Sequence, residues 1–181
     1  MTVIQPIALN QAGPDTAPTL AAIKAKLGVL PNMMLTLANA PAALNAYVAL
    51  SGAVAGGKLS AAQRESIAIT IAQTNSCGYC LSAHTLIGKG AGLSESDIRA
   101  ARDAQSTNEK TQALLQLSQR IVETRGHLDA ADIAAFRNAG GSDAEILEVI
   151  ANVALNTYTN YVNHIAGTKI DFPEVSLDKA A

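Results

Sequence analysis

At the centre of the chain lies the sequence NSCGYCLSAH, residues 75–84. It holds the only two cysteines of the protein, Cys77 and Cys80, in a C-x-x-C spacing, and His84 follows four residues after the second. In an α-helix, residues three, four and seven positions apart share one face. A helical stretch would therefore point two thiols and an imidazole the same way, which indicates dithiol redox chemistry.

Helix signals dominate on both sides of this stretch. The patterns S-x-x-Q at Ser60, S-x-x-D at Ser94 and S-x-x-E at Ser142 predict helix starts. Asn75 or Ser76 is expected to cap the helix that carries the cysteines. Further helices are predicted over residues 16–28, 32–39, 41–56, 108–126 and 129–140, followed by an extended arm over residues 168–181. No alternating run of β-branched and aromatic residues predicts a strand. We therefore predict a single all-α domain over residues 1–181, a bundle of about seven to eight helices.

Composition limits the classes of partner. Charged residues make up only 15% of the 181 residues, whereas about a quarter is usual, and 49% are hydrophobic. This deficit predicts that apolar surface is buried against other copies in a homo-oligomer. The net charge of −2, without a basic cluster, argues against nucleic acid and anionic membrane as partners.

The first residues of the chain and the length of its hydrophobic runs bear on the cellular compartment of the protein. There is no secretory signal at the start and no apolar run of the ~20 residues that span a bilayer. We expect a cytoplasmic protein. In that compartment a close cysteine pair is catalytic or metal-binding more often than structural.

The motif offers two ways to activate a thiol. Unpaired backbone N–H groups at a helix start favour a thiolate, and His84 can accept a proton from a cysteine one turn away. The second cysteine can then capture a sulfenic acid as a disulfide. The helix dipole favours Cys77 as the attacking residue and the nearby base favours Cys80, so the residues leave the choice open.

Two further residues are candidates for the site. Glu65 flanks an apolar run twelve residues before Cys77, and a fold-back at residues 74–76 would bring it near His84. The alternative is a surface carboxylate paired with Arg64 or Lys58. His164 lies in a polar patch, residues 160–164, and is predicted either to line the same cavity or to satisfy a subunit contact.

Other uses of the cysteines compete with redox catalysis. C-x-x-C-x-x-x-H could supply three zinc ligands, with Glu65 as a fourth, but structural zinc sites usually add a second Cys or His pair. An inert buried pair is a further alternative. Covalent haem needs a histidine directly after the second cysteine, where this chain has Leu81, and a thioredoxin fold would need strands. No cofactor and no metal are predicted.

The spacing of Glu65, Cys77, Cys80 and His84 resembles the core motif of the alkyl hydroperoxidase D (AhpD) family, in the carboxymuconolactone decarboxylase-like superfamily. Two flanking segments are similar to its peroxidase-related branch. These are LPNM, residues 30–33, with Pro41, and NHIAGT, residues 163–168, with DFP, residues 171–173. The resemblance covers residues 28–173.

This resemblance implies an AhpD-like helical bundle, often assembled as trimers or hexamers, with thiol-dependent peroxidase activity. It implies that Cys80 forms the sulfenic acid, that Cys77 resolves it, and that Glu65 and His84 belong to a proton relay. The sequence departs at Tyr79, where the family hydroperoxidase has a histidine.

The leading hypothesis is therefore a peroxidase that reduces hydroperoxides and is re-reduced by a thiol donor, such as a lipoylated or thioredoxin-like protein. A non-catalytic dithiol sensor or adaptor and a zinc-binding structural module are the alternatives.

Overall fold

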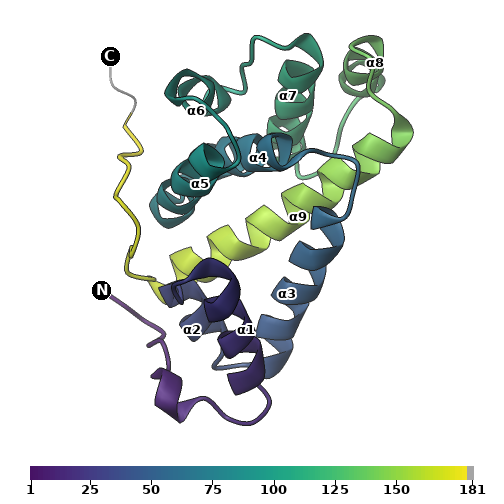
Figure 1. Cartoon of the computed structure of the whole chain (residues 1–181). Coiled ribbons are helices and arrows are strands. Elements are labelled where there is room, and N and C mark those ends of the chain that lie inside the picture. Colours follow the sequence, from purple (N-terminus) through teal and green to yellow (C-terminus); the bar gives the residue numbers. More distant parts are fainter. Residues whose placement is uncertain (179–181) are drawn as a thin grey trace.

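The computed structural model describes residues 1–178, and the regular secondary structure of this part of the chain is entirely helical (Figure 1). After a 3-10 turn at Leu9–Gln11 come the α-helices α1 (Ala17–Leu27), α2 (Asn32–Leu37), α3 (Pro41–Ala55), α4 (Ala61–Thr74), α5 (Gly78–Gly90), α6 (Glu95–Ala101), α7 (Glu109–Thr124), α8 (Ala130–Asn138) and α9 (Asp143–Ala166). The all-α prediction is confirmed. The described residues form nine α-helices, where seven to eight helices were expected. One of the nine, α2, has only six residues.

Helix α4 forms the centre of the fold. Seven consecutive residues, Ser66–Ala72, are buried, and the helix packs against α5, α6, α7 and α9. A helix that is apolar all round has to be covered on every side. Its polar exceptions are paired internally: the hydroxyl of Thr70 donates to the carbonyl of Ala101 at 2.6 Å.

The connection between α4 and α5 has only three residues. Asn75 caps the end of α4, Ser76 has φ +56° in the left-handed region, and Cys77 is the N-cap of α5. The backbone N–H of Cys77 donates to the carbonyl of Ala72 at 2.8 Å. The prediction that Asn75 or Ser76 caps α5 is wrong, because the left-handed residue moves the helix start one position on and puts a cysteine there.

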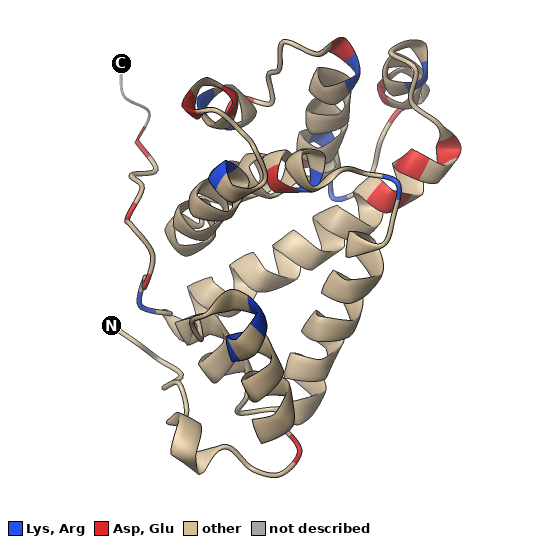
Figure 2. Cartoon of the chain, viewed as in Figure 1, with Lys and Arg blue, Asp and Glu red and all other residues tan. Residues whose placement is uncertain are grey.

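Helix α9 runs obliquely through the molecule, with α1–α3 on one side and α4–α8 on the other (Figure 1). Its buried face is unusually polar and carries Asn152, Asn156, Thr159, Asn160 and Asn163. After Glu148 the helix carries no lysine, arginine, aspartate or glutamate. Helix α3 carries none at all, so the surface that these two helices share lacks charge (Figure 2).

An extended arm follows α9, as predicted, up to residue 178; residues 179–181 of the predicted arm and domain lie outside the described residues. The arm packs Ile170, Phe172 and Leu177 against the core. The N–H of Val175 donates to the hydroxyl of Ser82 at 3.0 Å. These contacts lay the arm over the first half of α5.

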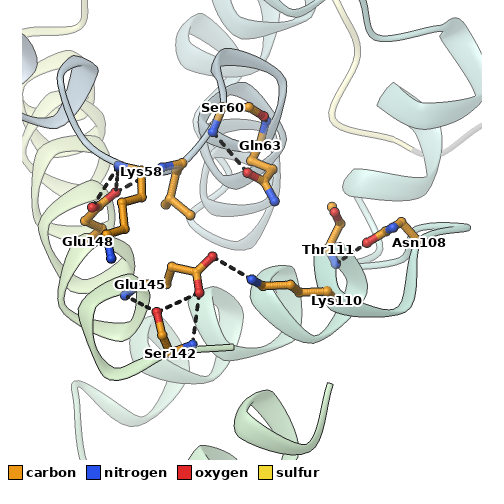
Figure 3. A network of polar contacts seen from close by, with 10 residues as sticks. Lys58, Ser60, Gln63, Asn108, Lys110, Thr111, Ser142, Glu145 and Glu148 are labelled. Carbon is orange, nitrogen blue, oxygen red and sulfur yellow. Dashed lines mark hydrogen bonds and ion pairs between the residues drawn. The ribbon is translucent and has the colours of Figure 1, made fainter. Parts of the chain in front are cut away.

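Polar groups fix the starts of α4, α7 and α9 relative to one another (Figure 3). The Glu145 carboxylate, part of the predicted capping box with Ser142, lies 2.7 Å from the Lys110 ammonium. Lys110, followed by the bonds to Ser142, lowers the pKa of Glu145 from its ordinary 4.5 to about 2. Because the folded-state pKa is depressed, this stabilisation is present above about pH 4.5 and is lost as the pH falls through 2.

Glu148 holds the turn before α4. Its carboxylate accepts the backbone N–H groups of Lys58 at 2.8 Å and Leu59 at 3.0 Å (Figure 3). Within residues 1–178, no helix is both long and apolar enough to cross a membrane.

We expect Glu148→Ala to lower the free energy of unfolding by about 2 kcal/mol, because hydrogen bonds to a charged group are lost and two N–H groups are left without that partner. Urea denaturation followed by circular dichroism measures the change. Glu123→Ala, at an exposed carboxylate paired with Arg120, is the control and should change stability by less than about 0.5 kcal/mol. Equal losses of stability in the two variants would contradict the role of Glu148 in holding the turn before α4.

Candidate redox-active site

The two cysteines occupy different environments although both are free thiols and buried, with exposed fractions of 1% for Cys77 and 2% for Cys80. Cys77 is the N-cap of α5 and Cys80 is its third residue. Cys80 lines a cavity of about 400 Å³, and Cys77 is not part of its wall. A small molecule in this cavity would therefore meet Cys80 first.

The cavity wall is mainly apolar and is built from six helices and the arm. Three aromatic side chains, Tyr47, Tyr79 and Phe172, contribute to it. Further apolar lining comes from Met33, Met34, Val54, Leu86 and Ile87. Polar lining comes from Asn152, Asn156 and Thr159 of α9 and from Lys26, Ser51, Arg64, Glu65 and His84. Small-molecule sites have this character, an apolar wall with a few placed polar groups.

Glu65 and His84 meet at this wall. The two residues come from adjacent helices, and Nδ1 of His84 lies 2.8 Å from Oε2 of Glu65. A carboxylate can only accept a hydrogen bond, so Nδ1 carries the proton and Nε2 is the ring nitrogen that can exchange one. Burial lowers the pKa of His84, but the charge and the hydrogen bond of Glu65 outweigh it and raise that pKa above its ordinary value.

The pKa values of the two thiols are pushed in opposite directions. A hydrogen bond from the Cys77 thiol is the main cause that lowers the pKa of Cys80, and the positive charge of His84 adds to it against the effect of burial. The same hydrogen bond and burial raise the pKa of Cys77. These opposite shifts favour a Cys80 thiolate that accepts a hydrogen bond from the Cys77 thiol.

Sequence reasoning missed two residues at this site. Nδ2 of Asn163 donates to Sγ of Cys80 at 3.2 Å. Tyr47 of α3 also lines the cavity, and burial, with the charges of Glu65 and Cys80, raises the pKa of its phenol despite a bond from Ser51. The polar patch at residues 160–164 and the segment NHIAGT, residues 163–168, both contain Asn163, but neither gave it a role. Of the two alternatives for His164, cavity lining is wrong, because its side chain is exposed and is not part of the cavity wall; the subunit contact stays a prediction.

Tyr79 joins three parts of the fold. Its hydroxyl accepts the backbone N–H of Met33 at 3.2 Å, and its ring meets the edge of Phe172 at 5.5 Å between centroids. Burial is the main cause that raises the pKa of this phenol, so Tyr79 stays neutral. It holds α5 against α2 and the arm, and it cannot carry a proton as an imidazole would.

No three histidine, cysteine, aspartate or glutamate side chains are grouped to hold a metal ion in the part of the chain that the structure describes. The geometry therefore adds nothing to the zinc alternative.

Residues 41–119, which span the cavity helices α3–α5 and both cysteines, match the carboxymuconolactone decarboxylase family. The AhpD-like fold of the whole chain agrees with this match. The central part of the chain, residues 41–119, is thus similar in sequence to the carboxymuconolactone decarboxylase family. No curated protein sequence matches the chain significantly.

Solved structures of this fold superpose on nearly the whole chain. The AhpD-core, peroxidase-related protein from Ralstonia eutropha JMP134 has a TM-score of 0.82 at 22% identity and covers 94% of each chain. A peroxidase-related protein from Silicibacter sp. TM1040 has a TM-score of 0.80 at 21% identity over 92% of each chain. A cysteine-to-alanine variant of the debrominase Bmp8 with bound 2,3,4-tribromopyrrole has a TM-score of 0.79 at 22% identity, covering 94% of this chain and 92% of that one. At these identities the likeness establishes the fold alone.

We expect iodoacetamide at pH 7 to modify Cys80 before Cys77. Because its pKa is depressed, Cys80 is a thiolate at pH values below the ordinary thiol pKa of about 8.5. The raised pKa of Cys77 keeps that thiol protonated at the same pH values. His84→Ala removes a positive charge, raises the pKa of Cys80 and should slow its alkylation several-fold. Peptide mass spectrometry against time measures both rates.

His164→Ala is the matched control, because this second histidine is exposed and away from the cavity, and its alkylation should equal that of the wild type. Preferential labelling of Cys77 would contradict the assignment of the thiolate to Cys80.

Proposed function

We propose that the protein is a thiol-dependent peroxidase that reduces organic hydroperoxides. One observation carries this proposal: of the two buried thiols, only Cys80 lines the cavity, and the His84–Glu65 pair lies beside it on the same wall. That arrangement supplies a thiolate and a proton donor at a cavity of about 400 Å³, with a second thiol hydrogen-bonded to the thiolate from outside the cavity wall.

In the first step the Cys80 thiolate attacks the terminal oxygen of a hydroperoxide. The O–O bond breaks, sulfur takes the oxygen and is oxidised to sulfenic acid, and the alkoxide leaves as alcohol. His84 supplies the proton from Nε2, and Glu65 stabilises the imidazolium before transfer. The raised pKa of His84 keeps it protonated to higher pH than a free histidine, which favours this role.

In the second step Cys77 attacks the sulfenic sulfur of Cys80. A disulfide forms and the hydroxyl leaves as water with the proton of the Cys77 thiol. A dithiol donor then returns both cysteines to thiols by exchange. We propose a lipoylated or thioredoxin-like protein as that donor, consistent with a cytoplasmic location.

The apolar wall favours an organic hydroperoxide over hydrogen peroxide. Met33, Met34 and Phe172 would contact an alkyl or aryl group, and burial of apolar surface supplies binding energy that hydrogen peroxide cannot obtain. We therefore infer the class of substrate from the apolar cavity wall and the type of reaction from the two cysteine thiols.

A second candidate is reductive dehalogenation of a halogenated aromatic ring, favoured by the three aromatic side chains of the cavity and by the debrominase among the structural relatives. The Cys80 thiolate would take bromine from carbon as a sulfenyl bromide while the ring carbon takes a proton. Cys77 would then release bromide and form the same disulfide.

The test follows consumption of cumene hydroperoxide with dihydrolipoamide as donor. We expect sustained turnover by the wild type and none by Cys80→Ser. Glu65→Gln and His84→Ala should each lower the rate, and loss of general acid catalysis by His84 costs about a hundredfold or more. Cys77→Ser should consume about one equivalent and leave a sulfenic acid at Cys80 that dimedone traps.

Glu95 is an exposed carboxylate paired with Lys89. Glu95→Gln is therefore the control for Glu65→Gln and should retain the wild-type rate. Disulfide formation without sustained turnover would instead support the dithiol sensor. Bromide release from 2,3,4-tribromopyrrole, with no peroxide consumption, would favour the second candidate.

A further inference from the structure

Two buried carboxamides of α9 lie next to the sulfur of Cys80. Asn163, with an exposed fraction of 4%, directs its Nδ2 hydrogens at two sulfur atoms, Sγ of Cys80 at 3.2 Å and Sδ of Met33 at 3.3 Å. Asn160, with an exposed fraction of 0%, lies one turn earlier on the same face. Its carboxamide is a further cause that lowers the pKa of Cys80.

The orientation of Asn160 is set from another helix. Nδ2 of Asn75, the residue that caps α4, donates to Oδ1 of Asn160 at 2.9 Å. Since that oxygen is the acceptor, Nδ2 of Asn160 is the atom left over, and it has no hydrogen-bond partner among the described residues. The only role left for this nitrogen is as a donor toward a neighbouring group.

Folding alone gives no reason for this arrangement. Besides Nδ2 of Asn160, Oδ1 of Asn163 is buried without a partner in the described chain. Buried polar atoms that stay unpaired destabilise a fold. Where a native structure keeps them, they need another explanation, such as a role in a functional site. A thiolate shut off from water is the group here that needs N–H donors.

We propose that Asn163 and Asn160, neither of which lines the cavity, form a carboxamide cradle that stabilises the Cys80 thiolate, and that Asn75 orients Asn160 for this role. The proposal deepens the proposed peroxidase function and rests on it for its purpose. Asn163 touches the reacting sulfur, whereas Asn75 acts through Asn160 and is a positioning residue. The cradle lets the attacking sulfur stay ionised while its cavity side is open to substrate.

The test measures the pH midpoint of Cys80 alkylation by iodoacetamide in the full chain. Asn163→Leu keeps the size of the side chain and removes the donor, so we expect a midpoint at higher pH and an alkylation rate at pH 7 lower by about tenfold. Ser118→Ala is the control. It removes a buried hydroxyl on α7, outside the cavity wall, that donates to the carbonyl of Leu114, so its midpoint should stay at the wild-type value.

A second variant guards against loss of folding by Asn163→Leu. Asn75→Asp places an acceptor against Asn160, whose carboxamide then has to turn its Nδ2 toward the new carboxylate and its oxygen toward the sulfur. We expect this to raise the midpoint through Asn160, the residue that Asn75 bonds. Ser76→Asp, at the adjacent exposed position, adds the same charge without the bond and should shift the midpoint less.

An unchanged midpoint in Asn163→Leu, or equal shifts in Asn75→Asp and Ser76→Asp, overturns the cradle. Because alkylation needs no peroxide, these outcomes are separate from the fate of the proposed function. A wild-type chain without peroxidase turnover but with the expected midpoint shifts would retain the cradle and lose the peroxidase.

Discussion

The three-residue connection between α4 and α5 is the constraint on which the site depends. With Ser76 in the left-handed region and the N–H of Cys77 bonded to the carbonyl of Ala72, the second helix has to fold back along the first. Glu65 and His84 thereby become neighbours although nineteen positions separate them. The same turn places Cys77 at the helix start and Cys80 on the cavity side.

Local signals were sufficient for much of the fold. The helix starts at Ser60, Ser94 and Ser142 were predicted because capping depends only on residues within one turn, and each capping box forms. Helical spacing predicted that Cys77, Cys80 and His84 share a face; Cys80 and His84 both line the cavity, whereas Cys77 precedes the helix and does not. These are short-range properties, which a single sequence carries in full.

The remaining features depend on how helices are rotated against one another. Asn163 and His164 are adjacent in sequence but about 100° apart around α9, so the packing of α9 against α5 decides which of them meets Cys80. The predicted start of α5 is wrong for a related reason, since nothing in the sequence indicates that Ser76 adopts a left-handed conformation. The predicted assembly into trimers or hexamers stays a prediction; the uncharged surface over α3 and α9 is compatible with it (Figure 2).

The aromatic content of the cavity has an optical consequence. The chain has no tryptophan, four tyrosines and two phenylalanines. Two of those tyrosines, Tyr47 and Tyr79, and one phenylalanine, Phe172, line the cavity that Cys80 faces. The near-ultraviolet spectrum of the protein is therefore weighted toward the site itself. Occupation of the cavity can be followed through intrinsic tyrosine signals, without a label and without altering a residue.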